Sequence, residues 1–404
     1  MSRVSIVTPD ERKMLDGAGD RMPLGALYVA TAAKQAGHDV TFYDLNHDKR
    51  EDLIDEAFTN PADVLGVSAT SSPSYNQMNR LLKQYQSVTS RTTTVAGGYH
   101  AMARPQDFSS ADHVIRGDGE QAIVDIAEGR KPEQGVQRVD FNTVPFPDLS
   151  LIQTDRYQMQ QKGRRAATMI TSRGCPFNCV FCGNYDRKVR FRTPDSIQGE
   201  LEQLTAAGFE SLYLLDDAFT VNRKHAMKVS DVIAKHKMPF RATTRADLLD
   251  ESLIEYLADN GMEIASIGVE SGNNDILRAA NKHTTTGEIE RAVVELHKYG
   301  VDSKGFFIFG LPGETPVEAQ QTIDFAMHLK DKGLTSADFY AMTPFPGTPI
   351  ANNPEKYGGR IIHHDWDKYL EAGKEEIQPA WETDGMSAEQ IKFFLEKAKA
   401  KWKS

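Results

Sequence analysis

Two separate blocks of the chain alternate short β-branched segments with amphipathic helical segments, and this alternation constrains the fold more than any other feature. In the first block, strands are predicted over 4–7, 40–43, 64–67, 92–95 and 113–115. Helices are predicted over 24–35 and 75–86, and a further helix ends at Ala127. Such alternation predicts an α/β domain with a Rossmann-like, doubly wound parallel sheet. Ligands bind such sheets at the C-terminal ends of the strands.

The alternation resumes at Ala166 after a segment rich in proline. The predicted strands are 166–171, 211–215, 241–244, 264–269, 304–309 and 337–342. Helices are predicted over 196–207, 223–235, 251–260, 286–299 and 316–329. Six such units fit a partial (β/α)6 TIM-type barrel, whose chemistry lies at the C-terminal ends of its strands.

These patterns divide the chain into four segments. We expect a Rossmann-like domain over 1–130, a linker over 131–163, a partial barrel over 164–350 and a C-terminal helical extension over 351–404. The linker assignment depends on Pro132, Pro145 and Pro147, because proline resists both helix and strand. In the extension, a helix is expected over 387–402.

Composition limits the class of partner. The 404 residues are 40% hydrophobic and 26% charged, as in ordinary globular proteins, and the formal net charge is −10. An acidic chain lacks the basic surface that general nucleic-acid binding needs, so nucleic acid is not an expected partner. Neither a signal peptide nor a membrane-spanning apolar segment is predicted. With no disulfide framework, we expect a reducing, cytoplasmic location.

All three cysteines of the chain, Cys175, Cys179 and Cys182, lie in one C-x₃-C-x₂-C segment. It follows the first predicted strand of the barrel, at the end where barrel chemistry lies. Thiolates are the usual ligands of iron–sulfur clusters, and three thiolates leave one of four irons open to a small molecule. The alternative is three-quarters of a zinc site with a histidine as fourth ligand. No histidine lies within 35 residues on either side of the segment, which favours the cluster.

The cysteine segment resembles the signature of radical S-adenosylmethionine (SAM) enzymes. The resemblance implies a [4Fe-4S] cluster whose open iron is chelated by SAM, which the reduced cluster cleaves to a 5′-deoxyadenosyl radical. Further motifs at the predicted strand ends imply SAM contacts, and the residues concerned are Asp216, Asp217, Arg245, Glu270, Ser271 and Gly310.

These residue types suit the roles that the resemblance implies. Asp216 or Asp217 supplies acceptors for the SAM amino group, and only one of them is expected to face the cavity, because neighbours on a strand alternate. Arg245 lies near the SAM carboxylate, which a guanidinium binds with two hydrogen bonds. Glu270 lies beside the ribose or amino acid part, and Gly310 near the adenine. The structural alternatives are a helix N-cap for the aspartates and a surface arginine at a helix start.

The first block resembles the N-terminal domain of cobalamin-binding radical SAM enzymes. The resemblance implies that small or polar residues at strand ends leave room for a wide, flat corrin. The residues are Leu24, Gly25, Thr70, Ser71, Gly97, Gly98, Tyr99, His100, Gly117 and Gly119. The alternative is a generic nucleotide-binding domain, but neither the G-x-G-x-x-G fingerprint nor a P-loop is present. The D-x-H-x-x-G motif whose histidine binds cobalt is also absent, so no histidine ligand is expected, although His100 lies in the right loop.

The combination implies a cobalamin-dependent radical SAM enzyme of the class B methyltransferase type. Its expected reaction is methylation of an unactivated carbon through a 5′-deoxyadenosyl radical and methylcobalamin. No further cysteine is present for a second cluster or a methyl-carrying thiol, which excludes members that need either. Ring-forming, oxidising or rearranging chemistry and a non-catalytic cobalamin-binding sensor remain as alternatives. The expected partners are a small-molecule or peptide substrate and an external one-electron reductant such as flavodoxin or ferredoxin.

Overall fold

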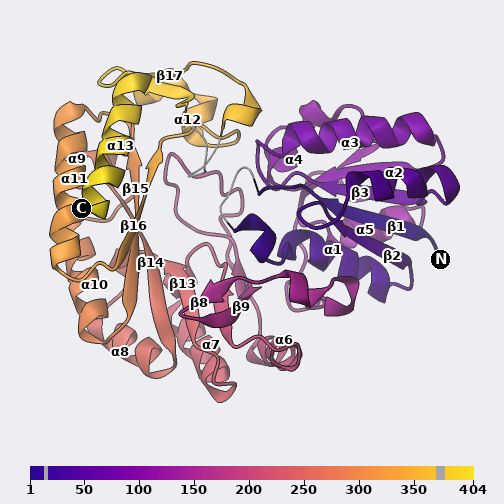
Figure 1. Ribbon diagram of the computed structural model, residues 1–404, viewed down its shortest axis with the longest axis horizontal. Coiled ribbons are helices and arrows are strands. Elements are labelled where there is room, and N and C mark those ends of the chain that lie inside the picture. Colours follow the sequence, from indigo (N-terminus) through magenta and orange to yellow (C-terminus); the bar gives the residue numbers. More distant parts are fainter. Residues whose placement is uncertain (13–16, 370–377) are drawn as a thin grey trace. The chain divides into compact units, whose positions relative to one another are not determined.

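The computed structural model describes residues 1–12, 17–369 and 378–404, and their Cα positions separate into two compact units. Unit 1 comprises Met1–Met159, and unit 2 comprises the described residues from Gln160 to Ser404. Figure 1 shows each unit as a sheet with helices packed against it.

Unit 1 is built on a five-stranded parallel sheet with the order β2-β1-β3-β4-β5. Its strands are β1 (Arg3–Thr8), β2 (Asp39–Asp44), β3 (Val64–Ser68), β4 (Thr93–Gly97) and β5 (His113–Val114). Its helices are α1 (Leu24–Gln35), α2 (Arg50–Thr59), α3 (Tyr75–Val88), α4 (Tyr99–Ala103) and α5 (Glu120–Ala127). The strand order reverses between β1 and β3, which is where doubly wound sheets bind ligands. The predicted Rossmann-like sheet is confirmed.

Alternation of apolar residues explains why these elements form. Helix α3 buries Met78, Leu81, Leu82 and Tyr85, at the spacing of one helical face. These side chains pack with Leu65 of β3 in the largest apolar cluster described for this unit. The strands of a sheet covered on both faces are buried along their length, as β1 is from Val4 to Thr8. The sequence analysis did not predict α2 and α4.

The segment expected to be a linker packs largely onto unit 1. Phe141 is 1% exposed and contacts the Tyr28 ring edge-on, and Tyr157 donates a hydrogen bond of 3.0 Å to the buried Asp44 carboxylate. Short elements lie within the segment: β7 (Val136–Gln137), which pairs with β6 (Arg116–Gly117), and the 3-10 turns Leu149–Leu151 and Thr154–Arg156. The prolines prevent long elements but not packing.

Unit 2 is built on a seven-stranded sheet with the order β16-β15-β14-β13-β12-β9-β8. The six parallel strands are β9 (Arg164–Met169), β12 (Ser211–Leu214), β13 (Phe240–Thr244), β14 (Met262–Glu270), β15 (Asp302–Phe309) and β16 (Ser336–Ala341). Strand β8 (Gln160–Gln161) adds an antiparallel edge. This curled, open sheet of six parallel strands confirms the predicted partial barrel.

Helices connect these parallel strands in the expected order. They are α6 (Pro194–Ala206), α7 (Arg223–Lys235), α8 (Glu251–Asp259), α9 (Asn274–Ala279), α10 (Thr286–Lys298) and α11 (Pro316–Asp331). Helices α10 and α11 begin at capping boxes, Thr285 with Glu288 and Thr315 with Glu318, which fix their starts. Helix α9 is short and was not predicted.

The residues after 350 are not helical throughout. They include the short helix α12 (Pro349–Asn352), the antiparallel pair β17 (Gly359–Ile361) and β18 (Trp381–Thr383), and helix α13 (Ala388–Lys403). Helix α13, predicted over 387–402, packs against β15 and β16. The buried Trp381 donates a hydrogen bond of 2.9 Å to the Gly310 carbonyl at the end of β15. The C-terminal segment thereby supports a strand end of the barrel.

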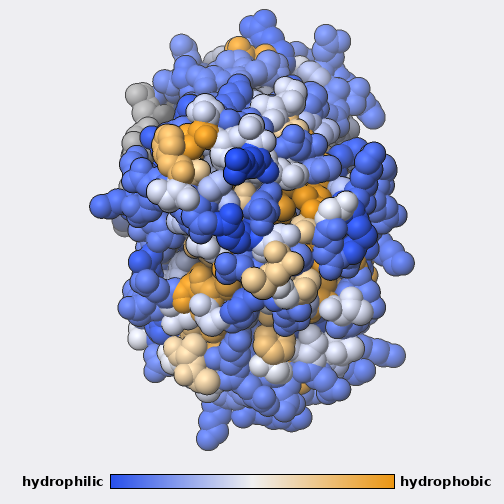
Figure 2. All heavy atoms as spheres, turned by 90° about the vertical axis from the view of Figure 1, so that its right-hand side faces the viewer, coloured by the Kyte–Doolittle hydropathy of each residue, from blue (hydrophilic) through white to orange (hydrophobic). Residues whose placement is uncertain are grey.

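Figure 2 shows one face of the molecule, on which small apolar areas are separated by hydrophilic atoms. Among the described residues, no helix is both long and apolar enough to cross a membrane.

Gly98 offers a test of how unit 1 is closed at its strand ends. Its φ is +92°, and an added Cβ would lie 2.5 Å from the Ala69 carbonyl oxygen, whereas the neighbouring Gly97 has nothing within 4 Å. We expect Gly98→Ala to destabilise unit 1 by about 2 kcal/mol or more, because backbone strain and overlap combine. Gly97→Ala is the matched control and should change stability little. Thermal unfolding with hydrogen exchange of unit 1 peptides measures both, and equal effects would contradict this reading.

Candidate active site

The cysteine segment lies in a loop that follows β9 and is closed by short backbone contacts. Strand β10 (Ser172–Arg173) pairs with β11 (Arg190–Phe191), so the loop leaves and returns at one place. The Cys175 N–H donates to the Asp186 carbonyl at 2.9 Å. Gly174 has a φ of +99°, and a Cβ there would overlap the carbonyls of Lys188 and Asp186. The glycine before the first cysteine is therefore required by the close approach of the returning chain.

The three thiols lie within electrostatic reach of one another. Cys179 is 8% exposed, and Cys175 and Cys182 are half-buried. Burial raises the pKa of the Cys175 and Cys182 thiols, and nearby Asp217 and the other cysteines add to the rise. Such thiols ionise readily only when a cation compensates the gathered negative charge.

The spacing of these thiols fits a cluster. In the part of the chain that the structure describes, no three His, Cys, Asp or Glu side chains lie close enough to hold a single metal ion. Ligands on different irons of a cube stand further apart than ligands on one ion. The donor set of three thiolates is also the usual one for iron–sulfur clusters.

Asp216 fastens the end of β12 to the start of the cysteine loop. Its carboxylate accepts hydrogen bonds from the Thr171 N–H at 2.6 Å, the Thr171 hydroxyl at 2.5 Å and the Ser172 hydroxyl at 2.7 Å. The side chain is 2% exposed, and burial raises the pKa of its carboxyl, while the bonds from Thr171 and Ser172 lower it. These three bonds leave Asp216 little capacity for a ligand.

Asp217 differs from its neighbour because it remains exposed. It accepts a hydrogen bond of 3.1 Å from the Gly174 N–H, directly before Cys175. Desolvation raises the pKa of the Asp217 carboxyl above its ordinary value, and the bonds from Gly174 and Asn184 lower it. Asp217 thus combines contact with the cysteine loop and an accessible carboxylate.

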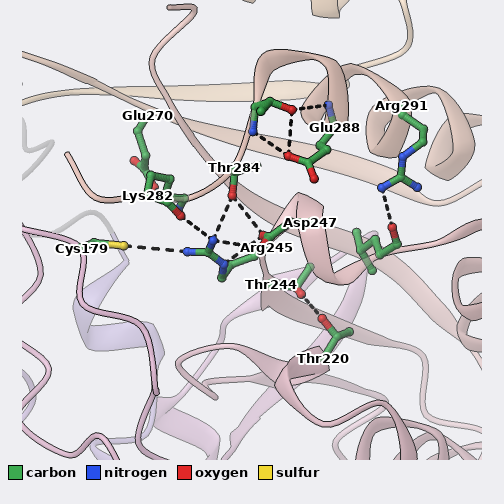
Figure 3. A network of polar contacts seen from close by, with 12 residues as sticks. Cys179, Thr220, Thr244, Arg245, Asp247, Glu270, Lys282, Thr284, Glu288 and Arg291 are labelled. Carbon is green, nitrogen blue, oxygen red and sulfur yellow. Dashed lines mark hydrogen bonds and ion pairs between the residues drawn. The ribbon is translucent and has the colours of Figure 1, made fainter. Parts of the chain in front are cut away.

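Arg245, directly after β13, is held within the protein and points at a cysteine (Figure 3). It is 5% exposed, and its guanidinium forms two hydrogen bonds of 3.0 Å with the Asp247 carboxylate. Further bonds go to the Lys282 carbonyl and the Thr284 hydroxyl, and one Nη lies 3.9 Å from Cys179 Sγ. The predicted contact with the SAM carboxylate is not tested here and stays a prediction.

Glu270 ends β14 in a strained conformation and forms a buried ion pair. Its φ is +64°, unusual for a residue with a side chain, and its Oε1 lies 2.7 Å from Lys282 Nζ. Both side chains are 7% exposed. A Cβ at Gly268 would overlap both charged groups, so that glycine makes room for the pair. Strained backbone of this kind is frequent at functional sites.

Ser271 and Gly310 are both engaged by the protein. The fully buried Ser271 hydroxyl lies 3.1 Å from the Thr322 hydroxyl and accepts the Asn273 N–H at 3.2 Å. The Gly310 N–H donates to the Glu314 carboxylate, and its carbonyl accepts from Trp381. These contacts position the ends of β14 and β15, and contacts of either residue with SAM remain predictions.

In unit 1, two of the predicted cobalamin residues carry hydroxyls that meet an acidic side chain. The hydroxyls of Thr70 and Ser71, after β3, both donate to the Glu11 carboxylate, which follows β1. The contact spans the point at which the strand order reverses. Desolvation raises the pKa of the Glu11 carboxyl, and the two hydroxyls lower it.

His100 is a buried structural residue. One ring nitrogen lies 3.0 Å from the Ser72 hydroxyl, the other lies 2.9 Å from the Asp107 carboxylate, and the ring stacks on Tyr75. The side chain is fully buried, and burial lowers the pKa of its ring. With both nitrogens engaged, His100 presents none to a metal, in keeping with the absence of an expected histidine ligand.

The remaining predicted cobalamin residues differ in exposure. Leu24 is buried in α1, whereas Gly25 is exposed and Gly97 and Tyr99 are half-buried. Gly117 has a φ of +94° and lies against the Gln137 carbonyl, and a Cβ at Gly119 would contact the Val29 side chain. Gly25 and Gly97 have open space where a side chain would stand.

Sequence reasoning missed four side chains that hold the site. Thr171 and Ser172 bond Asp216, and Lys282 and Thr284 contact Glu270 and Arg245. The first two stand directly before the cysteine segment, and that position was the available signal. Lys282 and Thr284 lie between α9 and α10 beside Asn281 and His283, which have positive φ, and nothing in the sequence marks that segment.

Two protein families match this chain, one in each unit. Residues 15–127 match the B12 binding domain, and residues 169–326 match the Radical SAM superfamily. Both segments carry the strand-end residues described above.

Similar curated proteins include methyltransferases and a cyclase. The uncharacterized methyltransferase PH0819 of Pyrococcus horikoshii is 29% identical over 93% of this chain and 86% of its own length. Bacteriochlorophyllide d C-12(1)-methyltransferase of Chlorobaculum tepidum is 28% identical over 88% of this chain and 78% of its own. Anaerobic magnesium-protoporphyrin IX monomethyl ester cyclase of Rubrivivax gelatinosus is 27% identical over 87% of this chain and 69% of its own.

A solved structure shares the fold. The radical S-adenosylmethionine methyltransferase TsrM from Kitasatospora setae, with cobalamin and a [4Fe-4S] cluster bound, superimposes with a TM-score of 0.73 at 18% identity. The match covers 90% of this chain and 78% of that one.

Glu314 supplies a pH test of the strand-end loop after β15. It is fully buried and holds the Gly310 N–H, and burial raises the pKa of its carboxyl to about 8. The folded pKa is raised, so its contribution to stability is fully present below pH 4.5 and is lost as pH rises towards 8, at about 1.4 kcal/mol per pH unit. Glu314→Gln keeps the acceptor and cannot ionise, so we expect it to lose less stability between pH 5 and pH 8 than the unmodified chain.

Urea unfolding followed by tryptophan fluorescence measures this difference. The three tryptophans, Trp366, Trp381 and Trp402, all belong to unit 2, so the signal reports on the unit that contains Glu314. Equal pH dependence in the two proteins would show that Glu314 ionises normally in the folded chain.

Proposed function

The chain belongs to the B12-binding radical SAM family, and from that membership we propose that it methylates an unactivated carbon of its substrate. Its cofactors are a [4Fe-4S] cluster, SAM and cobalamin. The observation that carries the proposal is the cysteine loop at the C-terminal end of β9, which holds every cysteine of the chain. Three thiolates leave one iron for SAM, and no thiol remains for another cluster or for carrying a methyl group.

Once bound, the cluster and SAM supply an organic radical that removes a hydrogen atom from the substrate, and cobalamin carries the methyl group that takes its place. The protein's own contribution is to bind, orient and exclude water. We assign Cys175, Cys179 and Cys182 to the cluster. Of the two aspartates after β12, Asp217 is the better acceptor for the SAM amino group, because Asp216 already accepts three hydrogen bonds within the protein.

Glu270 and Lys282 form the second part of the proposed SAM site. A buried ion pair with a strained partner offers both an acceptor for hydroxyls and a cation for a carboxylate. In unit 1, we assign the open space above Gly25 and Gly97 to the corrin, with Glu11, Thr70 and Ser71 at the strand reversal beside it. Because His100 is engaged on both nitrogens, we propose that cobalt takes no ligand from it.

Methylation is favoured over other outcomes by the similar proteins named as methyltransferases. The second candidate is ring formation or oxidation by the same cofactors, which the similarity to a cyclase favours. The substrate is proposed to be a small molecule or a peptide, and the electron to come from an external one-electron reductant such as flavodoxin or ferredoxin.

Replacement of a cluster ligand tests the metal assignment. After anaerobic reconstitution, we expect Cys175→Ala, Cys179→Ala and Cys182→Ala each to lose the broad iron–sulfur absorption near 400 nm, because three ligands are the minimum for this site. Asp186→Asn, which keeps the backbone contact to Cys175, is the control and should retain the cluster. A cluster that persists in the alanine variants would sink the assignment.

Enlarging Gly97 tests the corrin assignment. We expect Gly97→Leu to retain less hydroxocobalamin through desalting than Gly97→Ala, with an unchanged thermal midpoint, because the side chain enters space that the protein leaves open. The visible spectrum of the desalted protein measures retention. Equal retention by both variants would place the corrin elsewhere.

Isotope transfer distinguishes methylation from ring formation. The reconstituted protein is incubated with a reductant, cobalamin, SAM carrying a deuterated methyl group and an extract of small metabolites. We expect 5′-deoxyadenosine and a product that contains the deuterated methyl group, both measured by mass spectrometry. 5′-Deoxyadenosine with an unlabelled, cyclised or oxidised product would favour the second candidate, and its complete absence would favour the non-catalytic sensor.

A further inference from the structure

The Arg245 guanidinium is fixed on nearly every side. Its Nε and one Nη form the paired 3.0 Å bonds with Asp247, and that Nη also contacts the Lys282 carbonyl and, at 3.0 Å, the Thr284 hydroxyl. Thr284 in turn donates to Asp247 at 3.0 Å, which closes the network. A planar group held in this way can present only its remaining edge to a neighbour.

That remaining edge faces the cysteine loop. The other Nη of Arg245 lies 3.9 Å from Sγ of Cys179, the most buried of the cysteines, and Figure 3 shows the two side chains directed at each other. The guanidinium carbon lies 3.8 Å above the centre of the Phe177 ring, and Phe177 lies between the first two cysteines. Arg245 therefore contacts the loop twice, through a sulfur and through an aromatic face.

The charges in this network are arranged in a line. Asp247 lies on one side of the guanidinium and the Cys179 sulfur on the other, so the positive group stands between two groups of negative or potentially negative charge. Removing Arg245 would leave the Asp247 carboxylate near the sulfur without compensation. Hydrogen bonds to ligand sulfurs and nearby charges are what set the reduction potential of an iron–sulfur cluster.

We propose that Arg245 is a positioning residue that orients Cys179 and raises the reduction potential of the cluster. The inference rests on the proposed function, since it requires that the cysteines bind a cluster. One electron from an external one-electron reductant enters the cluster, whose net charge becomes one unit more negative. A buried cation beside a ligand sulfur stabilises that more negative state over the oxidised one, and a hydrogen bond to the thiolate acts in the same direction.

The test is a potentiometric titration of the reconstituted protein, with the reduced cluster measured by electron paramagnetic resonance. For Arg245→Gln we expect the ratio of reduced to oxidised cluster at a fixed potential to fall by about three- to tenfold. Arg245→Lys keeps the charge without the fork and should recover part of the loss. Arg241→Gln is the matched control, because Arg241 lies on the same strand and also covers a ring, that of Tyr213, and its ratio should not change.

Asp247→Asn gives a second and opposite expectation. It leaves Arg245 in place but removes the charge that offsets the guanidinium, so the ratio of reduced to oxidised cluster should rise. A residue that merely held the loop together would not give shifts of opposite sign. This variant also decides the question if Arg245→Gln fails to take up a cluster.

The outcomes separate the inference from the proposed function. If the unmodified protein binds a cluster and neither Arg245→Gln nor Asp247→Asn changes the ratio in the expected sense, the inference is overturned and the proposed function stands. If the unmodified protein binds no cluster under conditions where it is folded, the proposed function fails, and the inference fails with it.

Discussion

The buried carboxylate of Asp216 is the contact on which the geometry of the site depends. It joins two neighbouring strand ends, because its acceptors take one backbone N–H and two hydroxyls from the residues that lead into the cysteine loop. A loop of this length has many conformations available, and anchoring its start removes most of that freedom. Truncating Asp216 would leave three donors in the interior without acceptors, a cost that a surface contact would not carry.

A second fastening acts on the same loop from β13 and β14. Arg245 contacts Phe177 and Cys179, and its own place is fixed by Asp247 and by the segment that contains Lys282 and Thr284. That segment is tied in turn to β14 through the ion pair of Lys282 with Glu270. The loop is thus secured at its start by β12 and in its middle by β13 and β14, so the thiols are arranged by the strand ends of the barrel.

The alternation of strands and helices was predictable because it depends on local pattern. The expected strand over 304–309 lies within β15, and the helix expected over 223–235 coincides with α7, whose apolar face is regular. The charged segment that forms α2 has few apolar residues, so its helix was missed. The prolines of the 131–163 segment concealed its packing, because the partners of Phe141 and Tyr157 are Tyr28 and Asp44, far away in sequence.

The candidate site was predictable by position and not by partner. Sequence placed an aspartate pair after β12, but only the meeting of distant residues shows that Asp216 is consumed by Thr171 and Ser172 while Asp217 stays exposed. The same reasoning applies to each acid near the thiols: Asp247 is matched by Arg245, and Glu270 by Lys282. Asp217 alone among these four is accessible and held only by neutral donors that the structure records. A cationic ammonium group approaching the open iron would therefore find its best electrostatic partner at Asp217, beside the first cysteine.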